Sequence, residues 1–120
     1  MESISDIILK IMEVRNLIQV YHWQTDKYAR HVASGDLYAS LNVSLDTFVE
    51  AYQKSGKFKV NIKGLSIRNM NDTSAKKLLV GFSDFLTKLT PMISDDPDLL
   101  NIRDDMLVNT NKTLFLFGRK

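Results

Sequence analysis

The chain has 120 residues, of which 44% are hydrophobic and 25% are charged, and its formal net charge is +2 at pH 7. This length predicts a single domain over residues 1–120, with enough apolar side chains for a modest core. A charge so close to neutral gives no reason to predict a nucleic-acid partner. The chain contains no cysteine, which excludes disulfides, thiol catalysis and thiolate zinc sites, so any metal would need nitrogen and oxygen ligands.

The first predicted helix begins near Ser3 or Ser5, either of which can cap it, with Asp6 in its first turn. Apolar residues then recur at helical spacing, and His22 falls on the same stripe. We therefore expect His22 to point toward the packed face of this helix. Two interpretations of His22 stay open: a buried histidine bonded to a carbonyl group, or a metal ligand.

The second predicted helix begins at Thr25 and runs to Tyr52, and it carries a polar stripe. The members of this stripe recur at gaps of three and four: His31, Gly35, Ala39, Asn42, Asp46 and Glu50. At about 1.5 Å of rise per residue, His31 lies roughly 22 Å from Asp46 and roughly 28 Å from Glu50. These residues cannot share a site within one straight helix.

Two copies of this helix would bring the separated groups together. If the copies cross antiparallel about a two-fold axis near Ala39, His31 of one copy lies opposite Asp46 and Glu50 of the other. The small residues Gly35 and Ala39 would let the helices approach. The stripe thus predicts self-association through an antiparallel contact of the second helix, in a homo-oligomer. The alternative is that the two carboxylates form an ordinary solvated helix edge.

The middle of the chain is predicted to leave the helical conformation. Lys54-Ser55-Gly56-Lys57 should end the second helix, with Gly56 as its C-cap. Apolar and polar residues alternate from Phe58 to Ile67, which predicts a short extended segment or a hairpin arm. The connection between the second and third helices is therefore expected to be long and partly extended.

Two more helices complete the predicted fold. The third runs from about Thr73 to Ile93, and Pro91 should kink it or end it early. Asp96-Pro97 is typical of a helix start, and the last helix is predicted from about Pro97 to Phe117. Four helices joined in this way predict an all-α domain of two antiparallel hairpins.

The spacing of the polar residues resembles a known signature. His22-Trp23, His31, and then Asp46 and Glu50 fifteen and nineteen residues beyond His31 resemble the ferroxidase signature of the Dps proteins, the DNA-protecting branch of the ferritin-like superfamily. In that family, two histidines of one subunit and two carboxylates of its two-fold partner bind iron. Gly35 stands where the Dps pattern usually carries an acidic residue.

This resemblance implies a ferritin-like four-helix bundle. It also implies a metal site formed by His22 and His31 of one subunit with Asp46 and Glu50 of the partner, holding iron or another divalent transition metal. The implied function is iron binding, with oxidation of iron(II) in a ferroxidase-type reaction and storage of the product. An alternative metal role is a structural site, for example for zinc.

A broader resemblance covers most of the chain. Tyr21-His22-Trp23-Gln24, the segment Phe48–Gln53 and the segment Leu99–Asp104 are similar to short ferritin-like proteins of large phages and other large DNA viruses. The apolar runs are too short for a membrane span, and Met1-Glu2-Ser3 has no basic lead into a signal sequence. We therefore expect an intracellular protein, in the host cytoplasm or the virion. A second function stays open: a virion component or assembly factor that keeps the bundle without redox chemistry.

Overall fold

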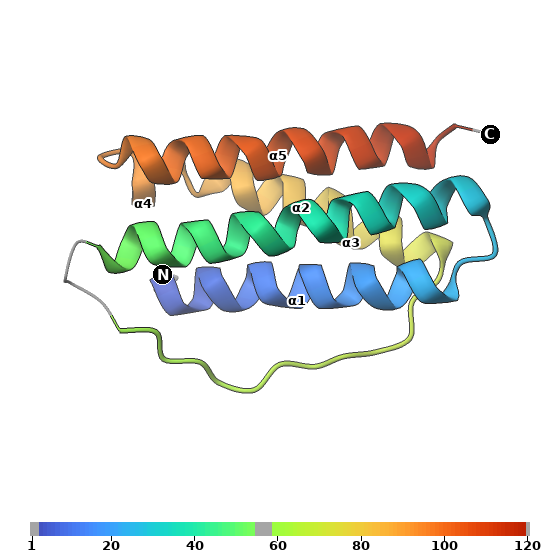
Figure 1. Cartoon of the computed structure of the whole chain (residues 1–120), viewed down its shortest axis with the longest axis horizontal. Coiled ribbons are helices and arrows are strands. Elements are labelled where there is room, and N and C mark those ends of the chain that lie inside the picture. The colour runs from blue at the N-terminus through green and yellow to red at the C-terminus, as the bar shows by residue number, and fades with distance from the viewer. Residues whose placement is uncertain (1–2, 55–58, 120) are drawn as a thin grey trace.

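The computed structural model describes residues 3–54 and 59–119. Within these ranges the chain is all-helical, without a strand, which confirms the predicted all-α class. The helices are α1 (Ile4–Gln24), α2 (Tyr28–Gln53), α3 (Asp72–Lys88), α4 (Thr90–Ile93) and α5 (Pro97–Phe117). The four long helices lie side by side, with α1 against α2 and α3, and α5 against α2 and α3 (Figure 1).

The connection between α2 and α3 sets the direction of the second pair of helices. Residues 59–71 run back along the outside of α1, so that α3 starts at the same end of the molecule as α2 (Figure 1). Gln24 fastens the far end of this connection: its Oε1 accepts a hydrogen bond from the Met70 N–H at 2.7 Å, and its Nε2 donates to Asn69 Oδ1 at 3.0 Å. The predicted long connection is thus present. Its described part holds no hairpin arm, and Gly56 and Phe58 lie outside the described residues.

The predicted helix starts are confirmed at both ends of the chain. Ser3 caps α1, and its side chain and that of Asp6 exchange hydrogen bonds with each other's backbone N–H groups. Asp96 caps α5 by accepting hydrogen bonds from two backbone N–H groups. Pro97 lies in the first turn of α5, where a backbone N–H would have no partner within the helix, so the lack of this group in proline costs nothing. The predicted start of the second helix at Thr25 is wrong, because α2 begins at Tyr28.

The third predicted helix ends earlier than its outer limit. The α3 helix stops at Lys88, and Pro91 lies in the first turn of the short α4 helix, so the proline does end the longer helix early. Arg103 holds this junction together. Its buried Nη1 donates to the Leu86 carbonyl oxygen and to Thr90 Oγ1, both at 2.8 Å. This guanidinium therefore joins α3, α4 and α5, which the sequence did not indicate.

Candidate functional site

Two histidines face each other where α1 passes into α2. His22 lies in the last turn of α1 and His31 in the first turn of α2, and only residues 25–27 separate the two helices. Their rings stack with centroids 3.9 Å apart and planes 14° apart. The Nδ1 of His22 lies 2.6 Å from the carbonyl oxygen of His31, and the Nδ1 of His31 lies 2.7 Å from the carbonyl oxygen of His22. We call this arrangement the histidine pair.

The hydrogen bonds of the histidine pair fix which ring nitrogen of each histidine carries the hydrogen. A carbonyl oxygen only accepts hydrogen bonds, so each Nδ1 carries the hydrogen and donates it. In a neutral ring the lone pair is then on Nε2. Neither Nε2 forms a hydrogen bond with a residue of the described ranges, and both side chains are half-buried. An imidazole whose Nδ1–H is held by a carbonyl group and whose Nε2 is unpaired has the usual environment of a metal-ligating histidine.

Gly35 makes room for the histidine pair. A Cβ atom at position 35 would lie 2.7 Å from Cε1 and 3.0 Å from Nδ1 of His22. The sequence suggested that Gly35 lets a second helix approach. Its space is instead occupied by a side chain of the same chain.

A polar network lies next to the histidine pair, since Tyr21 and Arg30 are the chain neighbours of His22 and His31. The fully buried Tyr21 donates from its hydroxyl to Asp72 Oδ1 at 2.5 Å, at the start of α3. Arg30 donates to that hydroxyl and to the Asp72 carbonyl oxygen, each at 3.1 Å. It also donates to the carbonyl oxygen of Phe117 at 3.1 Å and lies over the Phe117 ring. The network therefore joins the ends of α1, α2, α3 and α5.

Charge and burial set the protonation of this network. Burial raises the pKa of the Tyr21 hydroxyl, and its hydrogen bond to the Asp72 carboxylate adds to that shift. The hydrogen bonds from Tyr21 and Lys27 lower the pKa of Asp72. Sequence reasoning missed this network, because its partners are 51 residues apart and only the fold brings them together.

The two predicted carboxylates lie far from the histidine pair of their own chain. The α2 helix is unbroken from Tyr28 to Gln53, so the separation expected along the helix is kept. Asp46 lies in the wall of a groove between α1, α2 and the connecting segment, and Glu50 in the wall of another groove between α2 and α5. Across residues 3–54 and 59–119, one chain brings together no three histidine, aspartate, glutamate or cysteine side chains that could hold a metal.

The fold and the site define an all-helical protein with a hydrogen-bonded histidine pair at one helix turn. No helix of the described ranges is long and apolar enough to cross a membrane. The chain belongs to DUF5856, a family of unknown function, whose model matches residues 22–117. No curated protein and no solved structure matches the chain.

Proposed function

We propose that this protein is a ferritin-like, Dps-like iron-binding protein whose iron site forms between two subunits. The observation that carries the proposal is the histidine pair, with both Nδ1 atoms bonded to carbonyl groups and neither Nε2 atom bonded to a residue of the described ranges. The direction of the helices also supports it. Two antiparallel hairpins joined by a long crossover connection are the topology of the ferritin-like four-helix bundle.

The donor set of the proposed site fits iron. Imidazole and carboxylate groups together suit divalent transition metals of intermediate softness. A lone pair on imidazole lies in the plane of the ring, and two rings stacked 3.9 Å apart do not aim their lone pairs at one point. His22 and His31 would therefore each bind a separate ion, and the partner's carboxylates would supply the negative charge between the two ions.

The outer face of α2 supports an antiparallel contact. Exposed residues follow it at gaps of three and four, the spacing of a helix–helix seam: Tyr28, Val32, Asp36, Ala39, Val43, Asp46 and Glu50. A two-fold axis at Ala39 pairs Val32 with Asp46 and Tyr28 with Glu50. The same axis places the histidine pair of one copy over the C-terminal half of α2 in the other, where both carboxylates lie.

Iron is a substrate in this proposal. Two iron(II) ions give up one electron each, and the two electrons with two protons reduce one peroxide to two waters. The chain's own groups bind and position the ions, and the carboxylates stabilise the greater charge of iron(III). An oligomer with an enclosed interior would store the product.

The test compares the wild type with single variants of each half of the site. Protein purified without added chelator should contain iron, and it should oxidise iron(II) faster than the buffer does. His31→Ala should contain less iron and lose the oxidation, because it removes the ligand of one of the two ions that the reaction needs. Glu50→Ala should lower both properties, because it removes a carboxylate ligand. Asp105→Ala is the matched control, an exposed carboxylate of α5 outside the proposed α2 contact, and it should behave as the wild type. Equal iron content and oxidation in all four proteins would refute the proposal.

One observation favours a second candidate, a structural or assembly protein without redox chemistry. The His22 ring fills the space beside Gly35, where the Dps pattern usually has an acidic side chain. In this alternative the hydrogen bonds of the histidine pair hold α1 and α2 together, and the carboxylates make polar contacts between subunits. The same experiment separates the two candidates, because a scaffold would assemble normally and contain no iron.

A further inference from the structure

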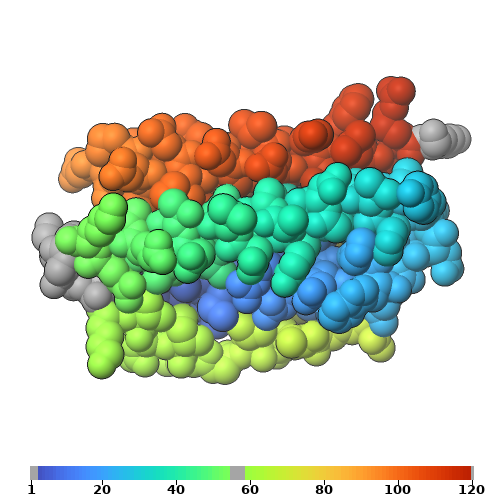
Figure 2. Space-filling model, in the orientation of Figure 1, coloured from blue at the N-terminus to red at the C-terminus, as the bar shows by residue number. Residues whose placement is uncertain are grey.

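An apolar groove lies beside the C-terminal half of α2. It has a volume of about 650 Å³ and is bounded by α1, α2 and the connecting segment. Its apolar lining comes from all three: Ile8, Met12, Leu45, Val49, Val60 and Ile62. Figure 2 shows α1 exposed here between α2 and the connecting segment. The groove is therefore open on the same face of the molecule as the outer stripe of α2.

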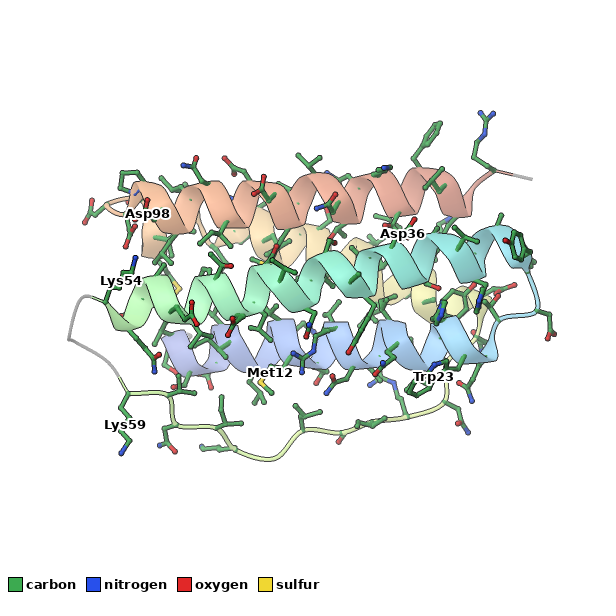
Figure 3. The ribbon with its side chains drawn as sticks, viewed as in Figure 1. Met12, Trp23, Asp36, Lys54, Lys59 and Asp98 are labelled. Carbon is green, nitrogen blue, oxygen red and sulfur yellow. The ribbon has the colours of Figure 1, made fainter. Side chains whose placement is uncertain are left out.

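A large aromatic side chain stands on the same face at the other end of the molecule. Trp23, the only tryptophan of the chain, is 67% exposed. Tryptophan side chains are usually well buried. Trp23 and Met12 are eleven residues apart on α1, which is about three helical turns, so they share one side of the helix. Figure 3 shows both on the edge of α1 next to the connecting segment.

The two-fold axis that completes the proposed iron site also relates these two features. His22 stacks on His31, so the end of α1 that carries Trp23 lies beside the start of α2, while the groove lies beside residues 42–49 of α2. A two-fold axis that reverses α2 about Ala39 exchanges these two positions and keeps both on the α1 side. Trp23 of one copy then lies over the groove of the other.

We infer that the groove bounded by Met12, Val49 and Ile62 is the docking site for Trp23 of a second copy of this chain. The inference rests on the antiparallel contact in the proposed function, and it adds the feature that anchors this contact. Each dimer would contain two such contacts, since a two-fold interface uses each surface twice. The connecting segment would thus take part in self-association.

The chemistry of the groove suits an indole. Its apolar walls would cover the ring, and tryptophan is the residue type most enriched among interface anchors. Asn42 and Asp46 in the same walls offer acceptors for the indole N–H, which needs a partner when it is buried. Arg15 also lines the groove, and among the described residues it bonds only to the amide oxygens of Asn16 and Asn42. Its guanidinium is therefore available to lie against the indole face.

The single tryptophan makes the inference directly measurable. In chelator-treated wild type, the emission of Trp23 should shift to the blue and resist acrylamide quenching as the concentration rises through the dimerisation range. Ile62→Asp should abolish both effects, because it places a charge in the groove. Ile67→Asp is the matched control: Ile67 belongs to the same segment, is 63% exposed and lies outside the groove. It should behave as the wild type.

Trp23→Ala should weaken self-association by roughly a thousandfold in sedimentation experiments, since the dimer loses two anchors and each is worth about 2 kcal/mol. A dimer in which Trp23 is as readily quenched as in the monomer would overturn the inference, as would equal effects of Ile62→Asp and Ile67→Asp. Failure of the proposed function alone would give a different result: Trp23 would be protected in the dimer, but the dimer would bind no iron. A wild type that stays monomeric at all concentrations would overturn both.

Discussion

Replacing Gly35 with alanine tests the histidine pair without touching either histidine. On an exposed helix surface this change stabilises a protein by about 1 kcal/mol, because alanine is the better helix former. At position 35 the new methyl group would lie 2.7 Å from His22 Cε1, so the ring must leave its place. Its departure breaks the hydrogen bond from His22 Nδ1 to the His31 carbonyl oxygen, worth about 1 kcal/mol, and crowding adds about 1–3 kcal/mol. We expect a net loss of about 2 kcal/mol in the free energy of unfolding.

Gly81→Ala is the matched control for this change. Gly81 is also helical, in α3, and nothing lies within 4 Å of a Cβ atom built there. This variant should be about 1 kcal/mol more stable than the wild type. Urea denaturation followed by circular dichroism gives both values, because the midpoint shifts while the slope stays constant. If Gly35→Ala stabilised the protein as much as Gly81→Ala does, the His22 ring would not lie against Gly35.

The remaining predictions concern the two polar networks. Tyr21→Phe should lower the free energy of unfolding by about 2 kcal/mol, since it removes a donor to a charged group and leaves Arg30 one partner short. The Tyr21 pKa is raised in the folded protein, so the folded state holds this proton more tightly than the unfolded state does. The free energy of unfolding should therefore fall as the pH rises through the usual tyrosine range. In Tyr21→Phe this fall should be smaller, because the variant has no hydroxyl to lose its proton. The Asp72 pKa is lowered, so the free energy of unfolding should also fall as the pH drops through the usual aspartate range. In Asp72→Asn this fall should be smaller when unfolding is followed in an acid titration. Arg103→Met should cost about 2 kcal/mol in urea denaturation, because the Leu86 carbonyl and Thr90 hydroxyl lose their donor; an unchanged midpoint would contradict the assigned role.

The helical part of the fold could be predicted because its signals are local. Apolar periodicity, the Ser3 cap and the Asp96-Pro97 start depend only on neighbouring residues, and α5 covers the predicted residues Pro97–Phe117. The predicted start of α2 at Thr25 is wrong although threonine is a residue type that commonly caps helices. The Thr25 hydroxyl does accept the Lys27 N–H at 3.2 Å, but the chain stays extended until α2 begins at Tyr28.

The candidate site could be predicted only in part. The sequence indicated that His22 points toward the packed face, and it left open whether a carbonyl group would bond to it. It did not indicate that His31 bonds in return, because that exchange depends on the angle between α1 and α2. The partners of Tyr21 and Arg30 depend on the position of α3, which a long connection sets. Nothing local marks the groove, since three separate segments form its walls.

The central claim is that histidines of one subunit and carboxylates of another form one iron site, and mixed oligomers test it most directly. A double variant His22→Ala, His31→Ala and a double variant Asp46→Asn, Glu50→Gln should each bind no iron alone. Co-expressed with different affinity tags and purified as the mixed dimer, they should regain one intact site of the two, because the histidines of the second variant meet the carboxylates of the first. Iron binding restored to half the wild-type level is the predicted result. A mixed dimer that binds no iron would contradict the claim.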